Sequence, residues 1–148
     1  VYKRQPVTLC AFQIPQGGSI YFRDIGPLLG FTDSIKLETE YSLRITSLLF
    51  GQATFRRATA VNGPGRVLFM VTGDPPPIDA TGVFPTGTLV AWDVNEHFKV
   101  SAQETVADAF LSEHSLQAMS QRVLRDQNAG RGFSTAVIRV VRRFLLPL

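Results

Sequence analysis

The segment from residue 66 to 102 constrains the fold most, because it contains two extended runs separated by three consecutive prolines. Residues 66–72 (RVLFMVT) are apolar on both faces of a strand, which predicts a central or sandwiched strand. The prolines at 75–77 have no backbone N–H, so they predict an extended crossing rather than a tight hairpin. A second long strand begins at Gly87. Its alternation of apolar residues continues past residues 95–97 only if the chain shifts there, so we expect a β-bulge.

The preceding part of the chain consists of short extended runs with turn signals between them. Residues 7–14, 19–25 and 53–60 are strand candidates bounded by proline or glycine. Residues 34–49 alternate apolar and polar side chains with a period of two, which predicts one buried and one solvated face. Residues 28–31 are expected to pack beneath a loop. Six strands separated by turns are typical of an antiparallel sandwich or barrel.

After residue 100 the period changes from that of a strand to that of a helix. Ser101 and Glu104 have the spacing of a capping box, in which the serine and the glutamate each bond the other's backbone N–H. A helix is therefore predicted to follow and to end at residues 128–132. Residues 134–146 fit either a helix or a strand, and their β-branched content favours a strand. The apolar stripe of the predicted helix contains Val106, Phe110, Leu116, Met119, Val123 and Leu124.

Length and composition predict a single domain, and the pattern of strands predicts that it is mainly β. The chain has 148 residues, 45% of them apolar, which is enough for one core. We expect residues 6–102 to form an antiparallel β-sandwich, jelly-roll-like and N-terminally truncated, and residues 103–148 to form a helical, basic C-terminal segment of the same domain. Residues 1–5 (VYKRQ) look like a translated adapter from a sequencing library, so we expect them to be foreign to an environmental sequence fragment. No apolar run approaches the roughly 18 residues of a membrane span.

Charge is distributed unevenly along the chain. Residues 6–121 carry a net charge of −4, whereas residues 122–148 carry a net charge of +5. A basic segment on an acidic domain indicates an anionic partner, namely nucleic acid, a membrane surface or an acidic protein. The same arginines could instead be scattered surface residues and the solvated face of a helix. They are Arg122, Arg125, Arg131, Arg139, Arg142 and Arg143.

The sequence contains no signature of catalysis or cofactor binding. Walker loops, dinucleotide fingerprints, nucleophile elbows and paired histidines at metal-binding spacing are all missing. The single cysteine, Cys10, excludes an internal disulfide. Asp74 and Asp79 flank the proline run and could hold a hard cation, but loop acids are usually only solvated. We therefore predict a protein that is not an enzyme, with no catalytic residue, no bound metal and no cofactor.

The run from residue 66 to 100 resembles the last two strands of the jelly-roll shell domain in coat proteins of small icosahedral positive-strand RNA viruses, of the tombusvirus, sobemovirus and nodavirus kind. The resemblance lies in a strand ending in a Gly-Asp loop, a variable crossing, and a long strand that opens on glycine (GTLVAWDVNEHFKV). It implies a structural capsid protein that self-assembles in many copies into a shell and is located in the virion. The residues that carry the second strand's pattern are Gly87, Leu89, Trp92, Val94 and Glu96.

The resemblance also implies a role for the basic C-terminal segment. Shell proteins neutralise packaged phosphates through counterion release rather than base readout, so the six arginines named above become candidate RNA contacts without sequence specificity. The alternative is a cellular β-sandwich binding module for carbohydrate or protein. In that case Tyr21 or Phe84 would be the candidate aromatic contacts.

Overall fold

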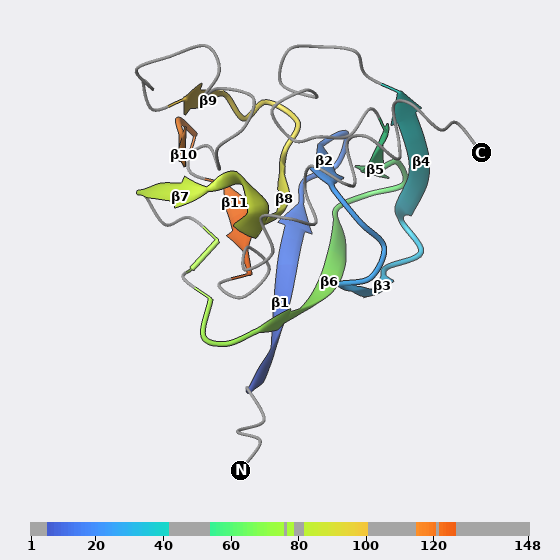
Figure 1. Cartoon of the computed structure of the whole chain (residues 1–148). Coiled ribbons are helices and arrows are strands. Elements are labelled where there is room, and N and C mark those ends of the chain that lie inside the picture. Colours follow the sequence, from blue (N-terminus) through green and yellow to red (C-terminus); the bar gives the residue numbers. More distant parts are fainter. Residues whose placement is uncertain are drawn as a thin grey trace, which may run out of the picture.

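The computed structural model shows an antiparallel β fold arranged in three sheets (Figure 1). Sheet A has the strand order β1 (Val7–Ile14), β6 (Gly65–Thr72) and β3 (Leu28–Phe31). The structure describes residues 6–41, 54–75, 77–78, 82–100, 115–120 and 122–126.

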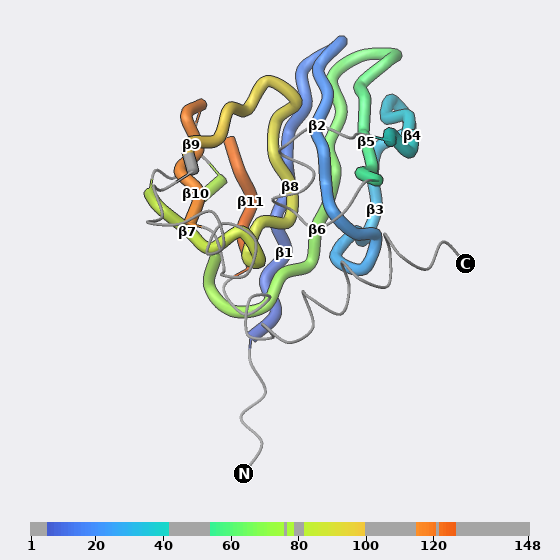
Figure 2. Tube along the Cα trace, turned by 45° about the horizontal axis from the view of Figure 1, so that its top comes forward, coloured from blue at the N-terminus to red at the C-terminus, as the bar shows by residue number. Residues whose placement is uncertain are grey.

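Sheet B is the largest sheet and lies between the other two. Its strand order is β11 (Val123–Arg125), β8 (Leu89–Asp93), β2 (Ser19–Phe22), β5 (Thr54–Ala60) and β4 (Ile35–Tyr41). Figure 2 shows β8, β2 and β5 side by side, with β4 at the far edge. The four strand pairings of this sheet among the described residues are all antiparallel.

Sheet C is small and packs on the β8–β11 end of sheet B. It consists of β7 (Val83–Pro85), β10 (Ser115–Ala118) and β9 (Phe98–Val100), in that order. A 3₁₀ turn, η1 (Thr86–Thr88), links β7 to β8 and so carries the chain from sheet C into sheet B.

Two hydrophobic cores hold the three sheets together. Between sheets A and B, the rings of Phe22 and Phe69 meet edge to face with centroids 5.6 Å apart, and Phe12 is fully buried beside them. Between sheets B and C, the ring of Trp92 packs against the rings of Phe55 and Phe98, with centroid separations of 5.6 Å and 6.1 Å respectively. Each such buried aromatic or aliphatic side chain contributes about 1.5–3 kcal/mol to folding.

The predicted antiparallel β-sandwich is confirmed, with most strands close to their expected bounds. Residues 7–14 form one strand as predicted, while the strand expected over 19–25 ends at Phe22. Residues 28–31 form a strand of sheet A, paired with β6, rather than a segment beneath a loop. The strand expected over 34–49 is described from Ile35 to Tyr41, and its remainder lies outside the described residues.

The prediction of one long strand from Gly87 to residue 100 is wrong in one respect. The segment contains two strands, β8 and β9, which belong to different sheets. The chain turns at the place where a bulge was expected, because Asp93 Oδ1 accepts a hydrogen bond from the Asn95 backbone N–H at 3.0 Å and Asp93 O accepts one from Glu96 N–H at 2.9 Å. This turn carries the chain from sheet B to sheet C.

The predicted helix is also wrong where the structure describes it. Residues 115–118 and 123–125 are strands β10 and β11, held by pairing with β7 and β9 and with β8 respectively. The apolar residues at 116, 123 and 124 do face the cores, but from short strands. The predicted start of the helix at residues 101–104 and the ambiguous segment at 134–146 lie outside the described residues. In the described part of the chain, no helix has the length and apolar character needed to cross a membrane.

The middle of the outer face of sheet A, which points away from sheet B, is apolar. In the β1–β6 register Leu9 lies opposite Met70 and Ala11 lies opposite Leu68, and all four side chains are exposed. Leu9 is 67% exposed, so this part of sheet A is covered by nothing in the described chain. The prediction that β6 is central is confirmed within its sheet, whereas only one of its two apolar faces is buried.

Candidate functional site

An open hollow of about 650 Å³ lies where β1 ends and β6 begins. Its walls are the end of β1 with the following Pro15, the loop at Thr32 and the turn that leads into β6. Two arginine side chains, Arg66 and Arg122, line it, and no carboxylate does. An arginine-lined hollow without a carboxylate is a candidate anion-binding site.

The backbone around the hollow is held by close contacts between β6 and the loop after β3. Thr32 N–H donates to Arg66 O at 3.0 Å, and Thr32 Oγ1 accepts from Arg66 N–H at 3.0 Å. Gly65 lets the residues after this loop pack closely, because a Cβ there would clash with the Ile35 side chain. The Arg66 side chain is therefore carried on a rigid strand end, opposite Gln13 in the β1–β6 register.

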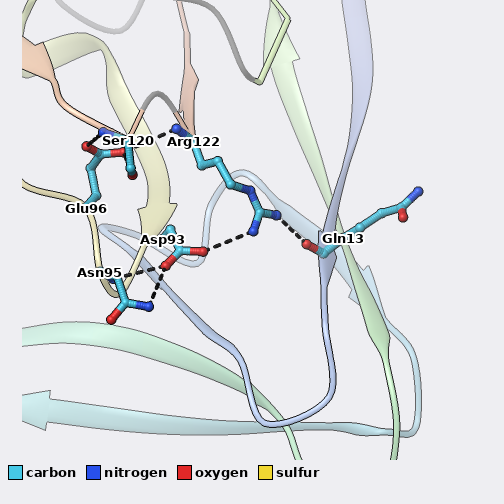
Figure 3. Close-up of polar contacts among 6 residues, drawn as sticks. All are labelled: Gln13, Asp93, Asn95, Glu96, Ser120 and Arg122. Carbon is cyan, nitrogen blue, oxygen red and sulfur yellow. Dashed lines mark hydrogen bonds and ion pairs between the residues drawn. The ribbon is translucent and has the colours of Figure 1, made fainter.

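Arg122 joins three strands by its side chain (Figure 3). Its Nη1 donates to Asp93 Oδ2 at 3.1 Å, and its Nη2 donates to the carbonyl oxygen of Gln13 at 2.7 Å. The guanidinium also lies 5.1 Å from the centre of the Phe12 ring. Arg122 thus fastens the start of β11 to the end of β8 and to the edge of β1, although these segments are far apart in sequence.

Glu96 positions Arg122 from the other side. Its carboxylate accepts hydrogen bonds from the Ser120 backbone N–H at 2.7 Å, from the Ser120 hydroxyl, and from the Arg122 backbone N–H at 3.2 Å. The residue is only 8% exposed. A buried carboxylate is tolerated when several donors satisfy it, so Glu96 is a structural clamp on the turn before β11.

The electrostatic character of the hollow comes mainly from Arg66. The Arg122 guanidinium is already paired with Asp93, which neutralises much of its field. Arg66 is exposed and has no ion-pair partner in the described part of the chain. An anionic group such as a phosphate could therefore bind Arg66 and reach the outer edge of the Arg122 guanidinium, by charge-assisted hydrogen bonds.

The six arginines predicted to contact RNA are not gathered on one surface where the structure describes them. Arg122 lies over Phe12, a residue of the core between sheets A and B, whereas the Arg125 guanidinium lies 4.9 Å from the centre of the ring of Phe84, a residue of the core between sheets B and C. Partial burial lowers the pKa of Arg125 by desolvation. The other four, Arg131, Arg139, Arg142 and Arg143, lie outside the described residues.

Sequence reasoning missed Arg66 as a site residue. A weak signal was present, because Arg66 directly follows the turn Asn62-Gly63-Pro64-Gly65, and strand ends next to such turns often carry functional side chains. Asp79, the second acid considered for a cation, lies outside the described residues. Within the described residues, no group of three or more potential metal ligands is close enough together to hold a metal ion.

Comparison with known proteins supports the fold and no more. No family model matches the chain, and no curated protein matches it significantly. Among solved structures, the crystal structure of protein SPYM3_0169 from Streptococcus pyogenes is similar to this chain, with a TM-score of 0.54 and 15% sequence identity. The match covers 82% of this chain and 62% of that protein, so this chain spans less than two thirds of its length. At this identity, what the chain is shown to share with that protein is its β architecture.

Proposed function

We propose that this chain is the β-sandwich part of a coat protein that assembles with copies of itself into a shell and contacts packaged RNA through basic side chains. The proposal rests on the antiparallel sandwich and on the resemblance of residues 66–100 to shell-domain strands. The observation that carries it is the uncovered apolar face of sheet A.

That face has the character of a contact surface. Val7, Leu9, Leu68 and Met70 are between 42% and 67% exposed and lie on two adjacent strands in register. Monomeric proteins rarely leave a contiguous block of large apolar side chains in water, and such blocks usually mark contacts with other proteins. Assembly with further copies of the chain would cover this face, which is what a shell protein requires.

RNA contact is proposed through charge alone. Arg66 at the hollow and the four arginines after residue 126 would neutralise phosphates by releasing counterions, without reading bases. Arg122 is a weaker candidate than its sequence position indicates, because Asp93 and the Gln13 carbonyl already occupy its guanidinium.

The decisive experiment is expression of the complete reading frame, followed by electron microscopy and measurement of co-purified nucleic acid. We expect particles of uniform size that contain RNA. Replacing Arg139, Arg142 and Arg143 with glutamate should abolish RNA co-purification and its dependence on salt. The matched control replaces three basic residues of the sandwich, Lys36, Arg56 and Lys99, with glutamate and should retain RNA.

Two outcomes would overturn the proposal. A protein that stays monomeric and free of nucleic acid would favour the alternative of a cellular β-sandwich binding module. Equal loss of RNA in the control variant would mean that overall charge, rather than the C-terminal arginines, governs binding.

A further inference from the structure

We propose that β1 pairs with β1 of a second copy of this chain, antiparallel and about a two-fold axis near Leu9, to form a continuous sheet. The inference rests on the proposed function in that it names one contact of the assembly, although a dimer of this kind does not require a shell. Its basis is the edge of β1 at residues 7–11, whose outward backbone groups have no hydrogen-bond partner among the described residues.

The orientation of the β1 backbone shows which groups face that edge. Pro6 O accepts a hydrogen bond from Gly73 N–H on the β6 side, so even-numbered residues of β1 bond to β6. The backbone N–H and C=O groups of the odd-numbered residues must therefore point away from β6. The carbonyl oxygen of Gln13 does so, because it accepts a hydrogen bond from the Arg122 side chain. The N–H and C=O groups of Val7, Leu9 and Ala11 share this direction and have no hydrogen-bond partner in the described part of the chain.

Apart from the Arg122 side chain at Gln13, β1 has none of the features that normally protect an edge strand. Edge strands are usually short, interrupted, or furnished with charges or proline to prevent pairing with other chains. The strand has eight residues, VTLCAFQI, without a charge, a proline or a bulge. An edge of this kind is a template for another strand.

The other described edges do carry such protection. β3 has four residues and contains a register shift. β11 has three residues and a register shift, and Ile78 O accepts from its Val123 N–H. β7 and β9 have three residues each. β4 carries Lys36, Glu38 and Glu40.

A second copy of β1 suits this edge as a partner because the strand is complementary to itself. Antiparallel self-pairing about Leu9 places Leu9 opposite Leu9 and Val7 opposite Ala11 of the other copy, so apolar side chains meet on the outer face. No like charges oppose each other, since the strand has none. This register uses all the unpaired groups of the three odd-numbered residues, about six hydrogen bonds in total, and leaves Gln13 to Arg122.

The pairing has a consequence for the outer face of sheet A. It would join the two exposed blocks, each containing Leu9, Leu68 and Met70, into one apolar surface that crosses the two-fold axis. In the proposed shell, dimers would contact further copies through that surface.

The first test compares two variants of Leu9 by sedimentation equilibrium of the whole chain. Leu9→Pro removes one N–H that faces the open edge and leaves the β1–β6 ladder intact, so we expect dimerisation to weaken about 100-fold or more. Leu9→Ala keeps the N–H and should still dimerise. Circular dichroism of Leu9→Pro should match that of the unmodified chain, which shows that the sandwich is folded.

The second test examines the register by disulfide formation. Pairing about Leu9 places Cys10 opposite Thr8 of the other copy at a non-hydrogen-bonded position, where Cα atoms are about 4.5 Å apart and a disulfide fits. Mild oxidation of Thr8→Cys should therefore give a covalent dimer in high yield, and the unmodified chain, with Cys10 alone, should not.

The outcomes separate this inference from the proposed function. A monomeric unmodified chain, or equal dimerisation of Leu9→Pro, would overturn the β1 pairing. Efficient crosslinking through Cys10 alone would replace the Leu9 register with one centred on Cys10 and so overturn the stated axis. Dimers that form neither shells nor RNA complexes would support the β1 pairing and refute the coat function. Shells built by Leu9→Pro would support the coat function and refute the β1 pairing.

Discussion

β1 and β4 are both long edge strands, of eight and seven residues, but their surface chemistry is opposite. On β4, Lys36 Nζ lies 2.8 Å from Glu38 Oε1, and Glu40 accepts a hydrogen bond from the Tyr21 hydroxyl at 2.8 Å. β1 has no charged residue and exposes Val7 and Leu9. Charged side chains on an edge strand disfavour pairing with a further strand, whereas an uncharged edge allows it. The comparison therefore indicates that β1 is suited to pairing with an added strand and β4 is not.

The two edges also differ in what their side chains contribute to folding. The ion pairs on β4 are exposed to water, where such pairs contribute little to stability. The inner face of β1 carries Phe12 and Ile14, both buried in the core between sheets A and B. The inner face of β1 therefore stabilises the single chain, and its outer face is available for contact with a partner.

The largest expected effect tests this division within β1. Phe12→Ala should lower the free energy of unfolding by about 3–5 kcal/mol, because it leaves a cavity in a fully buried position. Leu9→Ala should lower it by about 0.5 kcal/mol or less, since that side chain is mostly exposed. Urea denaturation at concentrations where the chain is monomeric measures both, and Phe12→Leu provides a milder change if Phe12→Ala does not fold. Equal losses of unfolding free energy would show that Leu9 is buried within one chain, and would contradict the contrast between the inner and outer faces of β1.

An intermediate effect is expected at Arg122, which closes one end of the β1 edge. Arg122→Met keeps an apolar stem near Phe12 but removes the contacts with Asp93 and with Gln13 O, so we expect a loss of about 1–2 kcal/mol, given that the ion pair is partly exposed. Asp93→Asn completes a double-mutant cycle that isolates the ion pair.

The same variant also tests whether Arg122 limits pairing at the β1 edge. Because it frees the Gln13 carbonyl, Arg122→Met should dimerise at least as well as the unmodified chain. The exposed control Lys99→Met should change neither the free energy of unfolding nor the extent of dimerisation. An Arg122→Met variant as stable as the unmodified chain would contradict the assignment of Arg122 as a clamp.

The smallest effect is expected on β4. A hydrogen bond from Lys36, together with its charge, lowers the pKa of Glu38. A lowered pKa in the folded state stabilises the fold above the ordinary glutamate pKa, and that contribution disappears as the pH falls through the lowered value. Because Glu38 is fully exposed, we expect the thermal midpoints of Glu38→Gln and the unmodified chain to coincide from neutral pH down to acid pH. A clear gap at neutral pH that closes on acidification would mean that the charges of β4 stabilise the fold as well as protect its edge.

Much of the fold could be predicted from local sequence. Short extended runs bounded by glycines and prolines predicted β1, β5 and β6 to within one residue of their starts and ends. The same reasoning failed for β10 and β11, because runs of four and three residues are too short to show a period. Their extended conformation depends on pairing with β7, β9 and β8, strands from other parts of the sequence.

The candidate site was less predictable than the fold. Arg122 was singled out for its charge, but its Asp93 partner is 29 residues away and its Gln13 partner 109 residues away, so no local pattern reveals either contact. Arg66 was overlooked because an isolated arginine after a turn has no distinctive spacing. Only the meeting of β1, β6 and the start of β11 places the two arginines in one hollow.

Local sequence patterns are enough to predict that this chain forms antiparallel strands with apolar faces, since alternation and turn residues act within a few positions of one another. They did not determine which apolar faces are covered. The side chains of β6 look equally apolar on both sides, yet Phe69 is buried and Met70 is 42% exposed. That difference was decided by the tertiary structure, because sheet B packs against only one face of sheet A, and burial depends on a partner surface that lies elsewhere in the chain or in another copy of it.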